Sequence, residues 1–221
     1  MRDNKILTII LLFIIILPGV AIAQVCGPFC PVCSGTGSST SALVSKGVII
    51  PNILYIPRGD EEKGVISLRG GATSWLDLGV GYTIEAEKLI WSVRLQPLNE
   101  VESSIFRPSI IVGTGSVQTG GSDQSVFIQI SKSWEINELF SIRISSGIAS
   151  LLPEVKKYYG LAGITLTISE KWSPFASYDG ISFHPGLSWI PKEWLAIGIV
   201  LIESKEPAIS VGIRYNLEKV K

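Results

Sequence analysis

From Val65 to Leu217, apolar residues mostly alternate with small or polar ones. A period of two is typical of β-strands whose two faces meet different surroundings. The alternation is clearest near the end of the chain, where the sequence from Ile209 to Leu217 reads Ile-Ser-Val-Gly-Ile-Arg-Tyr-Asn-Leu. Helical spacing is rare in this region. The pattern therefore predicts an all-β chain with one apolar face and one largely polar face.

Gly, Pro, Asp, Asn and charged clusters mark the turns between these strands. The pattern predicts an antiparallel, up-and-down β-barrel of 10–12 strands, with 12 favoured because bacterial single-chain barrels have even strand numbers. The predicted strands lie near 47–56, 64–71, 75–84, 88–97, 107–117, 124–134, 138–149, 157–169, 172–179, 184–190, 193–203 and 207–217.

The composition of the polar face distinguishes a transmembrane barrel from a soluble sandwich. A sandwich exposes its polar face to bulk water and favours Lys and Glu there, whereas this face is chiefly Gly, Ser, Thr, Gln and Arg. Small residues suit the crowded interior of a closed barrel, and scattered charges can pair across it. We expect each such charge to be a paired packing element first. The candidate lumen charges are Arg69, Asp77, Arg94, Arg143, Asp179 and Arg214.

The lengths of the connections give the barrel a direction, because outer-membrane barrels have short periplasmic turns and longer external loops. If the first strand rises from the periplasm, the short connections at 72–74, 135–137, 170–171 and 191–192 are periplasmic. The connections at 57–63, 118–123, 150–156 and 180–183 are then external and mostly longer. Two connections depart from this rule, the long stretch near 98–106 and the tight turn at 85–87.

Tryptophan positions provide an independent indication of a membrane, because aromatic side chains collect at the membrane–water interface. Trp91 lies within a strand, and the other five of the six tryptophans lie beside the short turns. The alternative is that tryptophans close a small soluble core at its turns. The predicted membrane-interface residues are Trp75, Trp134, Trp172, Trp189 and Trp194.

The first residues predict export. Arg2 and Lys5 precede an apolar run from Ile6 to Leu17, and Ala21-Ile22-Ala23 is the A-x-A pattern that signal peptidase cuts. A membrane-anchoring helix needs about 20 apolar residues, and this run is shorter. The sequence therefore predicts a bacterial outer-membrane protein whose signal peptide is cleaved near Ala23.

The chain then divides into four predicted parts. They are a signal peptide at 1–23, a flexible cysteine-containing leader at 24–46, the outer-membrane barrel at 47–217 and a charged tail at 218–221.

Lys plus Arg number 19 and Asp plus Glu also number 19, so no basic field would attract nucleic acid. The chain is 46% hydrophobic with a mean hydropathy of +0.39, yet has no second apolar run long enough to span as a helix.

Cys26, Cys30 and Cys33 form a C-x3-C-x2-C cluster in the leader. Iron–sulfur ligation by this spacing belongs to intracellular enzymes, and covalent haem attachment requires a histidine where Ser34 stands. A zinc site would need a fourth ligand. In an oxidising periplasm two of the three thiols would pair, and the spacing leaves the pair undecided. The favoured role is a stapled leader, and the alternative is disulfide linkage to a partner or a redox role.

His184 is the single histidine, and Ser182 and Asp179 stand near it. The three residue types could form a hydrolytic triad, but a lone histidine beside a turn is more often structural, and nothing marks Ser182 as activated. Glycine pairs such as Gly70-Gly71 lack the following helix and lysine of a phosphate loop. We therefore predict no enzymatic activity, no cofactor and no metal, with an outer-membrane hydrolase as a weak third hypothesis.

Four short motifs occur in the chain from Trp172 onward. They are Tyr178-Asp179-Gly180, Gly186-Leu187-Ser188, the hairpin from Ile190 to Trp194, and Val211-Gly212 with Tyr215. In these motifs the chain resembles the bacterial YjbH-like outer-membrane proteins. Pro108 with Val112-Gly113 is similar to an earlier strand of that family. The resemblance covers about half of the mature chain and implies an outer-membrane barrel, in some members linked to export of surface polysaccharide, with no catalytic residues. The charged end at 218–221 departs from the aromatic end of many barrels.

These observations predict a membrane-embedded barrel that acts as a narrow pore or as the membrane component of an export or envelope assembly. Barrels of about eight strands are filled by side chains and those of about 16 are open, so 12 strands would leave a narrow lumen. The leader from Gln24 to Lys46 is a candidate plug. The alternative function is a structural anchor that holds a periplasmic partner through the cysteine leader. The expected partners are the lipid bilayer and an envelope or export protein.

Overall fold

The computed structural model describes residues 42–58, 63–100, 106–116, 123–153, 157–169 and 171–220. The predicted signal peptide and the three cysteines lie outside these ranges. A short 3-10 helix, η1 (Leu217–Val220), begins at the last residue of the predicted barrel and continues into the predicted charged tail. No helix within the described ranges has the length and apolar character needed to cross a membrane.

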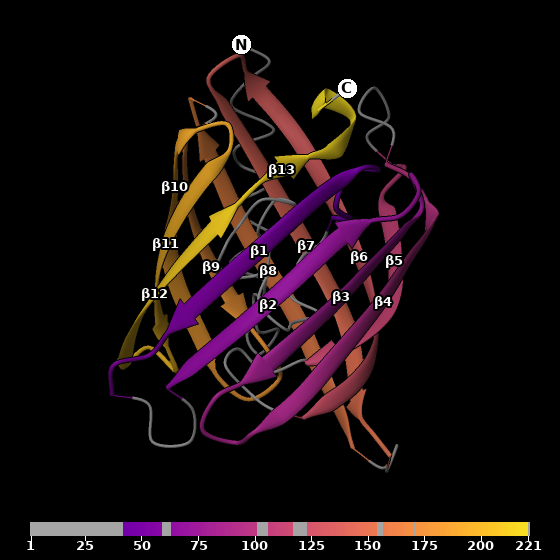
Figure 1. The fold of residues 1–221 in the computed structure, drawn as a ribbon. Coiled ribbons are helices and arrows are strands. Elements are labelled where there is room, and N and C mark those ends of the chain that lie inside the picture. The colour runs from indigo at the N-terminus through magenta and orange to yellow at the C-terminus, as the bar shows by residue number, and fades with distance from the viewer. Residues whose placement is uncertain are drawn as a thin grey trace.

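Antiparallel strands make up almost all of the described chain (Figure 1). Each strand pairs with the next in sequence, from β1 to β12. The strands are β1 (Val48–Tyr55), β2 (Gly64–Gly71), β3 (Leu76–Thr83), β4 (Lys88–Leu98), β5 (Ser109–Ser116), β6 (Gln124–Asn137), β7 (Phe140–Leu151), β8 (Tyr158–Ile168), β9 (Trp172–Tyr178), β10 (Phe183–Lys192), β11 (Leu195–Ile202), β12 (Glu206–Ile213) and β13 (Tyr215–Asn216).

The sheet closes on itself between β12 and β1. Asn52 pairs with Gly212, and the register continues to Tyr55 and Ile209. After a break at Arg214, β13 continues the line of β12 and pairs with the start of β1. The pairing of β12 with β1 joins the two ends of the sheet, so that neither strand is left as a free edge. The predicted fold, a closed antiparallel barrel of 12 strands, is confirmed.

The alternation in the sequence becomes an inside and an outside. On β12, Ala208 and Ser210 are buried, while Ile209, Val211 and Ile213 are 41–48% exposed. The same outward apolar rows run along the neighbouring strands, for example Leu78, Val80 and Tyr82 on β3. A water-soluble protein rarely exposes so continuous an apolar surface. The barrel is therefore apolar outside and largely polar inside, the reverse of a soluble domain.

The two ends of the barrel differ. The end that holds the start of β1 and η1 also holds the connections at 72–75, 138–139, 169–171 and 193–194, and we call it the short-turn end (Figure 1). The connections at 56–63, 117–123 and 152–157 lie at the opposite, long-loop end. Two connections break this rule of length, as the sequence predicts. The connection at 99–108 is long although it joins strands at the short-turn end, and the connection at 84–87 is short although it joins strands at the long-loop end.

All five predicted interface tryptophans lie on the outer surface near the short-turn end, with 38–52% of each exposed. Trp172 and Trp189 are directly paired between β9 and β10, and their rings stack with centroids 5.4 Å apart. Trp91 is also exposed, on the outer face of β4. The tryptophans therefore project from the wall and do not close a core at the turns.

Candidate functional site: the barrel interior

The chain preceding β1 turns into the barrel. Gly47 adopts a φ of 73°, its N–H bonds the carbonyl of Gly71, and Lys46 forms a parallel bridge with Gly71. Leu43 and Val44 are both buried. Gly71 makes this approach possible, because a Cβ there would overlap the carbonyl oxygens of Val44 and Ser45. We call residues 42–46 the inward segment.

The inward segment contacts well-separated parts of the wall. Val44 donates its backbone N–H to Asp77 on β3 over 2.9 Å. Its neighbour Leu43 belongs to an apolar cluster whose other members come one each from the four strands β5 to β8. Those members are Ile111, Phe127, Ala149 and Leu161. Because consecutive residues meet β3 and β5–β8, the inward segment stands in the lumen.

Asp77 is the centre of the first charged cluster. Its Oδ2 accepts from Arg69 Nη2 at 2.7 Å, and its Oδ1 accepts from Arg94 Nε at 2.9 Å. All three side chains are at most 2% exposed. Two cations therefore share one carboxylate in this interior cluster.

Glycines provide the room for these two long side chains. Arg69 is paired with Gly79 on β3, and Arg94 is paired with Gly113 on β5. A Cβ at Gly79 would stand 2.8 Å from Arg69 Cγ, and one at Gly113 would stand 2.7 Å from Arg94 Cγ. Each arginine therefore lies over a neighbouring strand at a position where only hydrogen fits.

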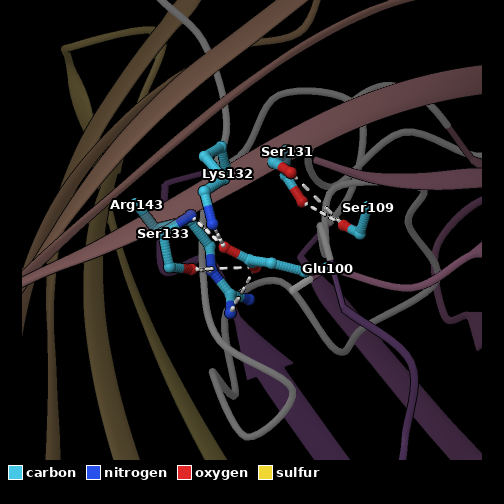
Figure 2. Close-up of polar contacts among 6 residues, drawn as sticks. All are labelled: Glu100, Ser109, Ser131, Lys132, Ser133 and Arg143. Carbon is cyan, nitrogen blue, oxygen red and sulfur yellow. Dashed lines mark hydrogen bonds and ion pairs between the residues drawn. The ribbon is translucent and has the colours of Figure 1, made fainter. Parts of the chain in front are cut away.

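A second charged cluster forms around Glu100, at the short-turn end (Figure 2). β5 begins at Ser109, opposite Ser131, so β6 has no partner strand on that side beyond Ser131. The Glu100 carboxylate fills the gap by accepting the backbone N–H and the hydroxyl of Ser133. An edge backbone group is thus satisfied by a side chain from a connection.

Two cations flank Glu100. Lys132 Nζ lies 3.0 Å from Oε1, and Arg143 Nη2 lies 3.9 Å from Oε2. Figure 2 shows Glu100 reaching toward Lys132, Ser133 and Arg143, with the Ser109–Ser131 hydroxyl pair beside them. Arg143 also donates from Nε to Ser133 Oγ over 2.7 Å. This cluster, like the first, brings two cations to one carboxylate.

The third polar cluster links two connections at the long-loop end through His184. Its Nε2 lies 2.9 Å from Asp179 Oδ2, and its Nδ1 accepts the backbone N–H of Glu203 at 3.1 Å. Because Nδ1 is an acceptor, the proton must be on Nε2, which donates to Asp179. The geometry therefore fixes the neutral Nε2–H tautomer.

Asp179 lies beyond the end of β9 and caps its own connection. Its Oδ1 accepts the backbone N–H groups of Ile181 and Ser182. Burial opposes ionisation of this carboxyl, but the hydrogen bond from His184 and those from the two backbone N–H groups outweigh that effect. The pKa of Asp179 therefore lies below its ordinary value of 3.8.

The same geometry bears on the hydrolytic hypothesis. A serine triad needs one imidazole nitrogen on the carboxylate and the other on the serine hydroxyl. Here the second nitrogen of His184 is occupied by the Glu203 N–H, and Ser182 contacts Asp179 through its backbone. The arrangement has no base positioned to activate Ser182.

Arg214 departs from the other five candidate lumen charges, which point inward. It falls in the break between β12 and β13, where its side chain is exposed and its N–H bonds the carbonyl of Trp194. The prediction that it is a shielded lumen charge is wrong, because the alternation was extended through a residue at which the strand is interrupted. The alternation did not identify Glu100 and Lys132 as members of a charged cluster. Glu100 lies in a connection, and Lys132 falls on the outward side of β6.

The interior also contains an apolar band that the sequence analysis did not predict. Leu54, Val65, Phe175 and Val200 form one buried cluster on the inner wall. The Phe175 ring lies over Gly186 on β10, where a Cβ would overlap the ring. The cluster around Leu43 is a second apolar group among the otherwise largely polar residues of the interior.

Within the described chain, no group of three or more His, Cys, Asp or Glu side chains could hold a metal ion. The potential ligands of the interior are instead arginines, hydroxyls and amides. The arrangement can bind and orient polar solutes by hydrogen bonds and charge.

Comparisons with known proteins show a likeness of fold. No protein-family profile matches the sequence, and no curated protein matches it. Among solved structures, the chain is similar to the KdgM porin with a TM-score of 0.50 and 13% identity, over 76% of this chain and 98% of that one.

Two further solved structures are similar at lower scores. One is an outer membrane channel from Pseudomonas putida F1, with a TM-score of 0.36 and 8% identity over 79% of this chain and 97% of that one. The other is a mutant Rh. blastica porin, with a TM-score of 0.34 and 10% identity over 82% of this chain and 66% of that one. At these scores neither carries an argument, and the similarity to the KdgM porin establishes a porin-like barrel fold.

Proposed function

We propose that this protein is a bacterial outer-membrane barrel that forms a narrow pore. The observation that carries the proposal is the inverted distribution of polarity in a closed barrel. Apolar side chains are exposed along the outer faces of β3, β4, β6 and β12, while Asp77 and its two arginines are buried in the interior. An apolar exterior of this extent is stable in a bilayer, and an enclosed polar interior offers a path for polar solutes.

The short-turn end would face the periplasm. Short connections and the five exposed tryptophans share that end, as expected for a rim at the membrane–water interface. The inward segment enters from the same end, so the leader would approach the lumen from the periplasm.

The pore would be narrow for two reasons. Twelve strands lie between the filled barrels of about eight strands and the open channels of about 16. The apolar band with Phe175 and the cluster around Leu43 narrow the interior further. We therefore expect a small single-channel conductance that depends on the inward segment.

Fractionation, gel migration and planar bilayers test the proposal. We expect the protein in the outer membrane, a faster-migrating folded band that shifts after boiling, and discrete channels in the bilayer. Recovery as a soluble periplasmic protein would exclude a membrane barrel. A heat-modifiable protein without conductance would retain the barrel and exclude the pore.

A deletion in the leader, before the inward segment, distinguishes a leader that plugs the pore from one that anchors a partner protein. The segment 42–46 packs in the lumen, so the informative deletion is 24–41, which leaves those contacts in place. A plug predicts larger conductance after the deletion. An anchor predicts unchanged conductance with loss of an associated periplasmic protein. Replacing Cys26, Cys30 and Cys33 by serine tests the cysteines separately.

The finer assignments follow from the sequence. Cleavage near Ala23 predicts that the membrane-extracted protein begins at Gln24, which N-terminal sequencing tests. The resemblance to YjbH-like proteins implies a place in an export or envelope assembly, in some members linked to surface polysaccharide. Affinity purification from detergent-solubilised membranes, with the 24–41 deletion as control, tests that association.

A further inference from the structure

Arg143 lies on the lumen wall without a direct hydrogen bond to the carboxylate beside it. Glu100 is the acidic partner of both Arg143 and Lys132, and Lys132 reaches it from the outward side of β6, where it is paired with Ile144. The carboxylate is committed elsewhere, since it binds Lys132 at 3.0 Å and accepts both the N–H and the hydroxyl of Ser133. At 3.9 Å, the approach of Arg143 to Glu100 is too long for a hydrogen bond. Arg143 is therefore the cation of this cluster that has no direct hydrogen bond to the carboxylate.

The guanidinium of Arg143 also has unused donors. Its Nε donates to Ser133, but its Nη1 is buried and has no hydrogen-bond partner within the described chain. A guanidinium offers five N–H donors in a planar fork, which matches the oxygens of a carboxylate or phosphate group. Leaving such a donor buried without an acceptor is unfavourable.

A second unpartnered group lies beside it. Thr165 on β8 is paired in register with Arg143 on β7, and directly opposed side chains have Cβ atoms about 5 Å apart. Thr165 is 3% exposed, and its Oγ1 likewise has no hydrogen-bond partner among the described residues. A hydroxyl donor and a guanidinium donor thus share one patch of inner wall.

Apart from Glu100 and Lys132, the polar neighbours of this patch along β7 and β8 are hydroxyl residues. Ser141 and Ser145 flank Arg143 on the inner face of β7, and Thr167 follows Thr165 on the inner face of β8. Hydroxyls can donate to further oxygens of a bound anion. A cation inside an enclosed lumen attracts anions more strongly than the same charge in bulk water.

We propose that Arg143 and Thr165 form an oxyanion-binding site on the lumen wall, which holds a carboxylate or phosphate group of a solute in the pore. The site deepens the proposed function and rests on it, because the lumen must admit the anion. Glu100 and Ser133 orient the guanidinium and leave Nη1 for the ligand.

Calorimetric titration of the full-length, detergent-solubilised barrel tests the site without requiring conductance. We expect inorganic phosphate or acetate to bind, and separate titrations distinguish a phosphate preference from a carboxylate preference. Arg143→Gln should weaken binding by at least about tenfold, the loss of one charge-assisted hydrogen bond. Thr165→Val should weaken it by a smaller factor. Arg214→Gln, at the exposed arginine, is the matched control and should bind as wild type.

If Arg143→Gln does not fold, Arg143→Lys and Thr165→Val test the site instead. Lysine keeps the positive charge but lacks the planar set of guanidinium N–H donors, so anion binding should still weaken. Absence of binding by folded wild type, or equal binding by wild type and all the Arg143 and Thr165 variants, would overturn the site. In bilayers under a potassium chloride gradient, the wild-type reversal potential should indicate anion preference, reduced in Arg143→Gln. Anion binding without conductance would support the site and reject the pore.

Discussion

Val44 donates its backbone N–H to the same Asp77 oxygen that accepts from Arg69, at 2.9 and 2.7 Å respectively. A segment outside the barrel wall is thereby joined to an ion pair within it. Asp77 also holds Arg94 through its other oxygen. One carboxylate therefore fixes two strands and the inward segment.

Asp77→Asn should destabilise the folded barrel strongly. The substitution leaves Arg69 and Arg94 buried without their shared anion, a change that costs about 3–5 kcal/mol for buried pairs. Urea unfolding in detergent, followed by heat-modifiable migration, measures the effect. The control is Asp123→Asn, which breaks an exposed pair with Lys88 at 3.2 Å, where about 0–1 kcal/mol is expected. Equal losses in the two variants would show that the interior cluster is not a stabilising centre.

Gly71→Ala should displace the inward segment. The added methyl would overlap the carbonyl oxygens of Val44 and Ser45, which are backbone atoms and cannot rotate away. We expect a loss of about 1–3 kcal/mol, as for other overpacked sites, together with higher conductance. Gly160→Ala is the matched control, because a Cβ at Gly160 meets nothing within 4 Å. A Gly71→Ala protein as stable as Gly160→Ala would contradict the docking of the segment.

The pKa of Asp179 predicts a dependence of stability on pH. Because this carboxyl has a folded-state pKa below its ordinary value of 3.8, its contribution is present above that value and is lost as the pH falls through the folded pKa. Wild type should therefore exceed Asp179→Asn in stability at neutral pH, and the gap should narrow below about pH 4. Urea midpoints measured across this range check the sign. A gap that widened on acidification would contradict it.

Ser182→Ala should leave any esterase activity of the purified barrel unchanged. Both nitrogens of His184 are occupied, by Asp179 and by the Glu203 N–H, so Ser182 has no base to activate it. Hydrolysis of a chromogenic short-chain ester by equal amounts of wild type and variant gives the comparison. Selective loss of activity in folded Ser182→Ala would show that the hydrogen bonds rearrange in a substrate complex.

The alternation fixed the faces of the strands well, because period two reports directly which side of a sheet a residue occupies. The predicted strand at 64–71 coincides with β2, and the predicted lumen residues Arg69, Asp77 and Arg94 meet in one cluster. Alternation does not report what lies across the lumen. Phe127 alternates with apolar residues on β6 and lies inside, and nothing in that alternation indicates that Leu43 packs against it.

Residues in connections escaped prediction for a different reason. Glu100 precedes β5 and has no periodic neighbours, and its importance depends on β5 starting late relative to β6. That offset is a matter of three-dimensional register. Arg214 was misplaced for the converse reason, since the regular pattern continued through a break in the strand.

The outer surface supplies the prediction that most directly separates a membrane barrel from a soluble one. Ile128 lies on β6 with its side chain outward and 40% of it exposed, well inside the length of the strand. In a bilayer, Ile128→Arg places a charge in the hydrocarbon layer and should cost about 2–4 kcal/mol near the midplane. The equivalent charge at the rim, Trp134→Arg, should cost about 0–1 kcal/mol from charge placement. Unfolding titrations in lipid vesicles measure both variants. If the two substitutions cost the same in vesicles, the apolar face is not embedded in lipid as proposed, since depth would then have no effect on the energy of the charge.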